Sequence, residues 1–361
     1  MGKILYVAST ISHINNFHTD YINALRADGH TVMVMARGEG ADFDIPFEKK
    51  LLSAKNKKCR KMIREIIDRE GFDAVILNTS LAAFHVRAAM RRKNRPWCIN
   101  FVHGYLFSRG GGIKDKILLM CERIHRRKTD KILVMNEEDF AIATEGRLSL
   151  YGVEMTLGMG AKCKSPIMTS DEVRGQIGAE GKFLLSFVGE LSGRKNQAFL
   201  LAAVERLKRD IPSILLCLVG DGGAKDELIE RARELDIEEN VAFVGPRANP
   251  CDFIRASDVY VSASKIEGMP FNIIEALGTD TPIVASDIKG HRDLIKDGEN
   301  GFLYSLECPC RLADIIRDIH SGARNILIDA MHRTYSEYCF ENVFEKTYKI
   351  LKGALENERE A

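Results

Sequence analysis

The stretch VYVSASKIEGMPFNIIEAL, residues 259–277, joins a short apolar run to a loop and a helix. Its first six residues are β-branched, aromatic or small, as expected for a buried strand. Pro270 suits the first turn of the helix, because its missing N–H would be unpaired there anyway. Two glutamates, Glu267 and Glu275, stand eight positions apart, one before the helix and one inside it. A buried strand that leads through a loop into a helix is the repeating unit of a parallel α/β sheet.

The same alternation of strands and helices runs through both halves of the chain. The expected strands are KILYVA, TVMVMA, AVILN, CINFVH and KILVMN in the first half, and FLLSFVG, ILLCLVG, VAFVG, VYVSAS, PIVAS and FLY in the second. Near-continuous apolar strands separated by helices are typical of parallel sheets covered on both faces. We therefore predict an α/β protein with two Rossmann-like, doubly wound domains facing a central cleft, residues 1–163 and 164–337. One long amphipathic helix is expected at the end of the chain, and its residues 338–361 form a segment that can pack back on the first domain.

The composition is that of an ordinary globular protein of about two domains, with 361 residues of which 45% are hydrophobic and 29% charged. Its apolar runs are far shorter than the roughly 20 residues of a membrane-spanning helix. The first ten residues resemble a buried strand more than a signal peptide. We therefore expect a cytoplasmic protein.

Signals for disulfides and metals are weak. The nine cysteines are scattered, and only Cys308 and Cys310 stand close together. Reduced, mostly buried thiols are expected rather than a disulfide framework or a zinc site. The DFD of residues 42–44 has the Asp-x-Asp pattern of some metal sites, but it lies beside a proline in an acidic loop. We predict no metal site.

Charge is divided unevenly along the chain, although the net charge is only +1. Residues 1–165 contain 28 Lys and Arg against 18 Asp and Glu, a net of +10, and the remainder contains 24 against 33, a net of −9. Basic clusters lie at 55–61, 91–95 and 125–128. An anionic membrane surface, nucleic acid and a merely solvated face are the possible explanations. Because no aromatic residues interleave the clusters as a stacking platform would require, we predict no nucleic-acid partner.

Loops that follow strands are the candidate sites, because ligands of open α/β sheets bind beyond the carboxyl ends of the strands. After FLLSFVG, Gly189 allows a tight backbone path, and Arg194 and Lys195 stand at the start of a helix. Cations are unfavourable there unless an anion is also present. A phosphate would satisfy both the cations and the free N–H groups, and an exposed basic pair is the alternative. The glycines of DGGAKDE lack the full G-x-G-x-x-G spacing and are a weak signal.

The loop that contains Glu267 offers donors as well as carboxylates. Four backbone N–H groups are expected to be available for a diphosphate or for sugar hydroxyls: those of Gly268, Met269, Phe271 and Asn272. Carboxylates suit vicinal diols, because each oxygen accepts one hydroxyl proton. A hexose and a ribose both carry such diols, so Glu267 and Glu275 are candidates to bind the two ends of a nucleotide sugar. The alternative is a surface loop and a solvated helix residue.

The first half carries polar side chains in comparable places. His103 ends the strand CINFVH, and Arg109 stands before three glycines. The segment SHINNFH supplies His13 and His18 in what we expect to be the first loop between a strand and a helix. A histidine at a strand end is more often structural than catalytic, but its place at the carboxyl edge of the sheet makes His103 a candidate.

Taken together, these segments resemble the family 4 glycosyltransferases, retaining enzymes of the GT-B fold, and especially the branch that builds bacterial exopolysaccharides and capsules. The matching segments, in order over about residues 3–305, are SHINNFH, HGYLF, VGELSGRKNQAFL, LVGDGG, VAFVGPR, SDVYVSASKIEGMPFNIIEAL and GHRDLIKDGENGF. The resemblance implies transfer of a hexose or N-acetylhexosamine from a nucleoside-diphosphate sugar, mostly of uridine, to a saccharide acceptor. It also implies retention at the anomeric carbon, with no cofactor and no metal.

The resemblance further implies roles for individual residues. Glu267 would contact hydroxyls of the donor sugar, and Glu275 would contact the ribose. Lys195 and Arg194 would neutralise the leaving diphosphate, and His103 would lie over the donor sugar near the anomeric carbon. The other implied donor contacts are Gly189, Glu190, Arg247, Gly268, Met269, Pro270, Phe271 and Asn272, and the acceptor side comprises Ser12, His13, Phe17, His18 and Arg109.

In this branch the acceptor is typically a lipid-linked saccharide at the cytoplasmic membrane face, with undecaprenyl diphosphate as one carrier. The resemblance therefore adds a peripheral location on the inner face of the cell membrane as an alternative. The stretch IKDKILLMCERIHRRK places Ile113, Ile117, Cys121 and Ile124 on one helical face, with cations elsewhere. A helix lying on an anionic membrane fits this pattern, and so does a core helix with a solvated basic face.

Two other functions are compatible with the same architecture. A sugar-nucleotide epimerase would convert the donor without any acceptor and would not need a basic acceptor half. A two-domain sugar-binding protein of the periplasmic type would bind without turnover. We expect no secretory signal, and Arg194 with Lys195 at the expected cleft does not suit that class.

Overall fold

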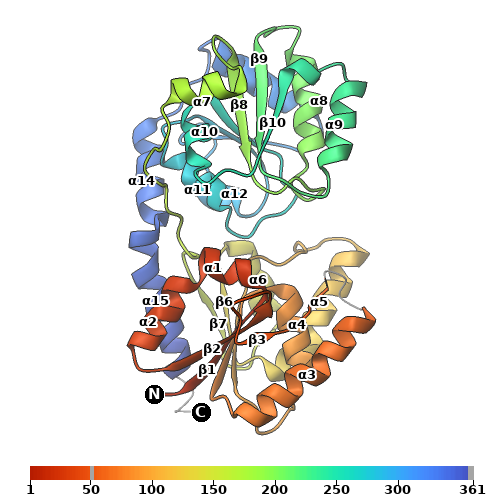
Figure 1. Cartoon of the computed structure of the whole chain (residues 1–361), viewed down its shortest axis with the longest axis vertical. Helices are drawn as coiled ribbons and strands as arrows, with labels where there is room; N and C mark the ends of the chain where they lie inside the picture. Colours follow the sequence, from red (N-terminus) through yellow and green to blue (C-terminus); the bar gives the residue numbers. More distant parts are fainter. Residues whose placement is uncertain (49–52, 357–361) are drawn as a thin grey trace. The chain divides into compact units, whose positions relative to one another are not determined.

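The computed structural model of the chain describes residues 1–48 and 53–356. It contains two compact units, one formed by residues 1–159 with the chain from residue 343, and the other by residues 160–342 (Figure 1). The divisions lie a few residues from the boundaries expected at 163 and 337. Of the terminal segment expected over 338–361, residues 357–361 lie outside the described residues.

The first unit is built on a parallel sheet of seven strands in the order β3-β2-β1-β4-β5-β6-β7. The strands are β1 (Lys3–Thr10), β2 (Thr31–Arg37), β3 (Phe43–Asp44), β4 (Ala74–Leu77), β5 (Trp97–Phe101), β6 (Lys131–Val134) and β7 (Val153–Met155). The helices are α1 (Ile11–Phe17), α2 (Thr19–Ala27), α3 (Ala54–Glu70), α4 (Ser80–Ala89), α5 (Ile113–His125), η1 (Arg126–Lys128), α6 (Glu137–Glu145) and, from Val343 onward, α15 (Phe340–Glu356). The five predicted strands are present, and the short edge strands β3 and β7 were not predicted.

The last helix of the chain packs on the first unit, where α15 runs beside α2 (Figure 1). The rings of Tyr21 and Phe344 lie 4.7 Å apart. Lys352 forms an ion pair with Asp28 (2.7 Å), and Nε1 of Trp97 donates to the carbonyl of Ala354 (2.9 Å). Aromatic packing, an ion pair and a buried hydrogen bond thus attach the end of the chain to α2 and β5.

Two expectations about helices were wrong. The segment SHINNFH is not a loop, because residues 11–17 form α1, which buries Ile14 against the sheet and ends at His18. The terminal stretch is not one helix either: α14 (Ile328–Tyr338) ends before Cys339, whose backbone is extended, and α15 begins after it. The cause is a strand-like bridge from Ala161 to Cys339, in which the N–H of Phe340 donates to the carbonyl of Ala161.

A buried ion pair fixes α5 to α4. The guanidinium of Arg87, which is fully buried, donates to both carboxylate oxygens of Glu122 (2.8 and 3.0 Å) and to Thr129. Such a bidentate pair is stabilising only when both partners are present, since either charge alone would be costly to bury. The inward face of α5 therefore carries this ion pair beside Leu118 and Leu119, which pack on an apolar cluster of the first unit.

The second unit is a six-stranded parallel sheet in the order β10-β9-β8-β11-β12-β13. Its strands are β8 (Phe183–Val188), β9 (Ile214–Val219), β10 (Val241–Gly245), β11 (Val259–Ser262), β12 (Ile283–Ser286) and β13 (Phe302–Tyr304). Its helices are α7 (Ser170–Ile177), α8 (Gln197–Leu207), α9 (Lys225–Glu234), η2 (Glu238–Asn240), α10 (Cys251–Arg255), α11 (Phe271–Leu277), α12 (His291–Leu294), α13 (Pro309–His320) and α14. Helices α8, α9 and α13 pack into one apolar core with the sheet, and α10 lies with α7 and α11 (Figure 1).

The expectation of reduced cysteines was wrong for one pair. Cys308 and Cys310 form a disulfide at the start of α13, while the other seven cysteines are free. Cys308 caps this helix by accepting from the N–H of Cys310, and the intervening Pro309 occupies its first turn. The carboxylates of the DFD segment, residues 42–44, accept hydrogen bonds from backbone N–H groups: Asp42 accepts from the N–H of Val34, and Asp44 accepts from the N–H of Gly38.

Candidate active site

Two loops of the second unit meet at the carboxyl edge of its sheet. β8 and β11 are parallel neighbours, so the loops that follow them leave on the same side. The N–H of Lys265 donates to the carbonyl of Arg194 (2.9 Å), and Nη1 of Arg194 donates to the carbonyl of Ile266 (3.3 Å). These two hydrogen bonds hold the basic loop against the loop that carries Glu267.

Glu267 is shared by two cations. Its Oε1 lies 2.7 Å from Nζ of Lys195, and its Oε2 lies 3.0 Å from Nη1 of Arg194. The side chain of Glu267 is only 9% exposed. Burial alone would raise the pKa of this carboxyl, but the charges of Lys195 and Arg194 outweigh burial and hold the pKa below its usual value. The cluster of one carboxylate and two cations keeps an excess positive charge beside the sheet edge.

Glycines in the loop after β9 allow it to pack tightly against the basic loop after β8. Gly220 has a φ of +140°, and a Cβ placed there would lie 2.0 Å from the carbonyl oxygen of Gly189. A Cβ at Gly222 would lie 2.3 Å from the carbonyl oxygen of Leu191. Gly220 and Gly222, which follow β9, are therefore needed for backbone packing against the loop after β8, and this packing explains these two glycines without a dinucleotide.

Glu275 has a different environment from Glu267. It lies in α11, partly buried, near Cys251 and Lys164. Burial and the neighbouring Cys251 raise the pKa of the Glu275 carboxyl to about 8, against a weaker opposing effect of Lys164. At neutral pH this carboxyl is mostly protonated, so it can donate a hydrogen bond as well as accept one.

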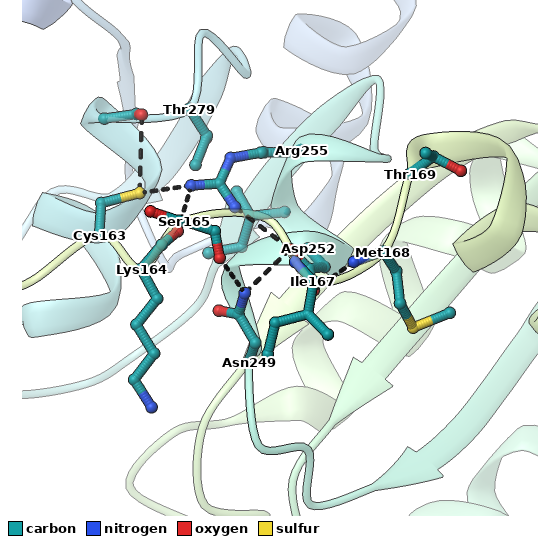
Figure 2. A network of polar contacts seen from close by, with 12 residues as sticks. Cys163, Lys164, Ser165, Ile167, Met168, Thr169, Asn249, Asp252, Arg255 and Thr279 are labelled. Carbon is teal, nitrogen blue, oxygen red and sulfur yellow. Dashed lines mark hydrogen bonds and ion pairs between the residues drawn. The ribbon is translucent and has the colours of Figure 1, made fainter.

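A polar network anchors the chain segment of residues 163–168 to α10, as Figure 2 shows. Nη2 of Arg255 donates to Sγ of Cys163 (3.0 Å) and to the carbonyl of Lys164 (2.6 Å). Asp252 accepts from the N–H groups of Ile167 and Met168. A hydrogen bond with Cys251, followed by the charge of Arg255, outweighs burial and lowers the pKa of the Cys163 thiol to about 7. Helix α10 thus fixes the start of the second unit next to Glu275.

Three histidines of the first unit come together. Ring nitrogens of His13, His18 and His103 all lie within 4.8 Å of one another. Oη of Tyr6 is 2.9 Å from Nδ1 of His18, and Nε2 of His18 is 3.3 Å from Nε2 of His13. Burial lowers the pKa of His13 to about 4 and holds the pKa values of His18 and His103 well below the usual range. All three imidazoles are therefore neutral at pH 7.

Comparison with known proteins identifies the class of this site. A family model described as group 1 glycosyl transferases matches residues 169–332, which include both loops. EpsD of Bacillus subtilis, assigned as a glycosyltransferase, is 29% identical over 84% of either chain. A UDP-Gal:alpha-D-GlcNAc-diphosphoundecaprenol alpha-1,3-galactosyltransferase of Escherichia coli is 26% identical over 70% of this chain and 67% of its own.

Solved structures give the same fold. Alr3699/HepE of Anabaena, crystallised with UDP and glucose, has a TM-score of 0.75 at 20% identity, and the match covers 98% of this chain and 100% of that one. Sucrose-phosphate synthase of Thermosynechococcus elongatus has a TM-score of 0.76 at 20% identity with the same coverage. The chain is a glycosyltransferase. Its second unit is a group 1 glycosyl transferase domain, and the predicted GT-B class of two Rossmann-like units with parallel sheets is confirmed.

The other predicted donor residues of the glycosyltransferase have distinct surroundings. Asn272 points inward, and its Nδ2 donates to the carbonyl of Val188 (3.0 Å) and to Oη of Tyr260 (2.6 Å). The guanidinium of Arg247 lies over the ring of Phe253. Gly268, Met269, Pro270 and Phe271 form the continuous stretch between Glu267 and Asn272. Helix α11 begins within it, at Phe271. Glu190 is exposed, and its carbonyl accepts from the side chain of Gln197.

Sequence reasoning missed two features beside the loop of Glu267. A Cβ at Gly290, whose φ is +81°, would lie 2.7 Å from the carbonyl oxygen of Gly268, so the loop after β12 presses on the loop of Glu267. His291 follows, fully buried, with Nδ1 2.8 Å from the carbonyl of Ser286. The segment GHRDL is part of a motif that matches the family 4 glycosyltransferases. A glycine and a histidine after a strand indicate no role by themselves.

Only some of the predicted acceptor residues of the glycosyltransferase lie close together. Phe17 stacks edge-on against His13, with ring centroids 5.1 Å apart. Ser12 contacts Thr10 through its hydroxyl (3.1 Å). Arg109 is exposed and forms an ion pair with Glu145 (2.6 Å). The histidine cluster therefore includes Phe17, and Arg109 belongs to a different part of the first unit.

Replacing Glu275 by Gln tests its protonation. Its pKa is raised to about 8 in the folded enzyme, so the native state holds an extra proton between about pH 4.5 and 8, and stability falls as pH rises through that window. Glu275→Gln removes this penalty. We expect its free energy of unfolding to match wild type at pH 4.5 and to exceed it by roughly 2–4 kcal/mol at pH 8.5. Denaturant titrations at both pH values provide the measurement, and an equal difference at both would show that Glu275 does not titrate abnormally.

Proposed function

We propose that the enzyme transfers a hexose or N-acetylhexosamine from a nucleoside-diphosphate sugar to a saccharide acceptor, with retention at the anomeric carbon and without a metal in the transfer step. The observation that carries this proposal is Glu267 held between Arg194 and Lys195 at the edge of the second sheet. A diphosphate is the kind of leaving group that such cations stabilise.

The proposed chemistry is chiefly electrostatic. As the bond from the anomeric carbon to the diphosphate breaks, negative charge accumulates on the leaving oxygen, and fixed cations aimed at it lower the barrier. Arg194 and Lys195 need no reorganisation for this, because Glu267 already holds them in place. Glu267 and Glu275 then orient hydroxyls of the sugar and of the ribose, and His103 serves at the donor sugar.

Names of relatives support a uridine donor and a lipid-linked acceptor. The Escherichia coli relative is named for UDP-galactose and a diphosphoundecaprenol-linked GlcNAc. A Campylobacter jejuni relative, 37% identical over 36% of this chain, is named for a saccharide on diphospho-undecaprenol. We propose UDP as the nucleotide of the donor and a saccharide on a lipid diphosphate as the acceptor, in the synthesis of a cell-surface polysaccharide such as an exopolysaccharide or a capsule.

Helix α5 supports a peripheral association with the membrane that would carry such an acceptor. Ile113, Ile117, Met120 and Ile124 recur at intervals of three and four residues and lie within an arc of about 60°. All four are exposed, Ile113 by 79% and Ile124 by 65%. The opposite face packs on the first unit, through Leu118 and Leu119 and through the ion pair of Glu122 with Arg87, and this packing leaves the isoleucines outside.

Cations border this apolar face. The exposed cations of α5 and of the turn that follows are Lys114, Lys116, Arg123, Arg126 and Arg127. Next to the helix, Arg109, Lys116 and Arg123 line a hollow together with the apolar side chains of Phe107 and Leu119. An apolar stripe between cations suits the interface of an anionic bilayer.

Among the helices of the described residues, none combines the length and the apolar character of a membrane span.

Lys195→Ala tests the role of the cations. We expect turnover with a UDP-sugar and a lipid-diphosphate-linked saccharide to fall by about 10²–10³, on the scale of losing one transition-state donor. Lys208→Ala is the matched control, because Lys208 pairs with the fully exposed Asp236. Mass spectrometry follows the product, and proton NMR reads its anomeric configuration. Turnover within threefold of wild type would remove Lys195 from the mechanism, and conversion of donor without acceptor would indicate an epimerase.

Ile117→Glu with Ile124→Glu tests the membrane face. A charge on the stripe should abolish flotation with anionic vesicles at low salt, because each glutamate opposes both burial and the lipid charge. Leu150→Glu, also at an exposed apolar residue of the first unit, should float like wild type. If wild type fails to bind such vesicles, or if the double variant still binds, α5 is not the membrane contact.

A further inference from the structure

The histidine cluster of the first unit has the dimensions of a metal site. Its members come from α1, from the junction of α1 with α2 and from the segment after β5. The ring centroids of His13, His18 and His103 are 4.8–5.1 Å apart. Nε2 of His13 and Nε2 of His18 are separated by 3.3 Å. Two nitrogens that each lie about 2.0–2.1 Å from a tetrahedral zinc ion are themselves about 3.3–3.4 Å apart.

A ring nitrogen in the cluster is left without a partner. Nε2 of His103 is buried and has no hydrogen bond to any described residue. Burying such an atom unpaired costs about 1–3 kcal/mol, so a purely structural cluster would be expected to satisfy it. This nitrogen belongs to the same group of rings whose nitrogens all lie within 4.8 Å.

A second layer around the cluster favours ligation. Oη of the fully buried Tyr6 lies 2.9 Å from Nδ1 of His18. If Nδ1–H donates to this hydroxyl, Nε2 of His18 carries a lone pair directed toward His13. Histidine ligands of metal sites are commonly held in this way by a hydrogen bond to the other ring nitrogen.

The ligand types of the cluster select a class of ion. The group consists of three imidazoles and contains no carboxylate or thiolate. Imidazole ligands suit zinc, cobalt, nickel and copper, whereas magnesium and calcium require oxygen ligands. Three protein ligands also leave a fourth position of a tetrahedral ion for water or another small ligand.

We propose that His13, His18 and His103 form a binding site for a zinc-like divalent cation in the first unit, with Tyr6 positioning His18. This site departs from our sequence-based prediction of no metal. A bound ion would take His103 away from the donor sugar, so zinc would inhibit transfer; that consequence alone rests on the proposed function. The transfer step itself does not use the ion.

Zinc binding to the full chain, without a histidine tag, tests the proposal. Competition with a chromophoric chelator should give one zinc per chain. His13→Gln and His103→Gln should each weaken binding at least tenfold, and Tyr6→Phe should weaken it about tenfold, on the scale of losing an outer hydrogen bond. His320→Gln, at an exposed histidine of the second unit, should bind like wild type. Circular dichroism checks that each variant is folded.

Cobalt gives a readout that does not depend on any variant. Cobalt bound to the wild-type chain should show visible bands of a low-coordinate nitrogen site and no thiolate charge-transfer band in the near ultraviolet. Absence of zinc binding, unchanged binding in folded His13→Gln, or a thiolate band that places the ion on cysteines would each overturn the proposal. Because these measurements need no turnover, they remain decisive if the proposed transfer reaction is wrong.

Discussion

The carboxylate of Glu267, shared by two cations, is the interaction on which the candidate donor site depends. A carboxylate that is nearly buried is costly unless it is paired, and here it is paired twice, with Lys195 at 2.7 Å and Arg194 at 3.0 Å. The two cations come from the loop after β8 and the carboxylate from the loop after β11, so the ion cluster joins two neighbouring loops. Removing the carboxylate would leave two like charges at close range. Its presence still leaves an excess positive charge that an anionic ligand can satisfy.

Backbone packing makes this arrangement possible. Gly220 and Gly222 let the loop after β9 press against the loop after β8, and Gly290 lets the loop after β12 press against Gly268. The ion cluster therefore lies between loops that are supported from both sides. Within this frame the two glutamates take opposite protonation states: cations keep Glu267 ionised, whereas burial keeps Glu275 mostly protonated at neutral pH. One accepts hydrogen bonds only, and the other can also donate.

Much of the fold could be predicted because parallel strands buried on both faces are continuous apolar runs, such as those of β8 and β9. The loop after β8 could be predicted as a candidate site because Arg194 and Lys195 stand where cations need an anion. Other features depend on contacts between distant segments. The break at Cys339 comes from its bridge to Ala161, and the histidine cluster requires α1 to approach the segment after β5. The inward ion pair of α5 depends on Arg87 in another helix, so periodicity alone could not tell which face of α5 is exposed.

The preference of the protein for a nucleoside diphosphate over its nucleoside tests the central claim most directly. Titration calorimetry with UDP and with uridine isolates the contribution of the phosphates in wild type and in Lys195→Ala. If the cations held by Glu267 bind the diphosphate, the variant should lose roughly 10–100-fold of its affinity for UDP, on the scale of one charged hydrogen bond, and keep its affinity for uridine. An unchanged ratio of the two affinities would contradict the account.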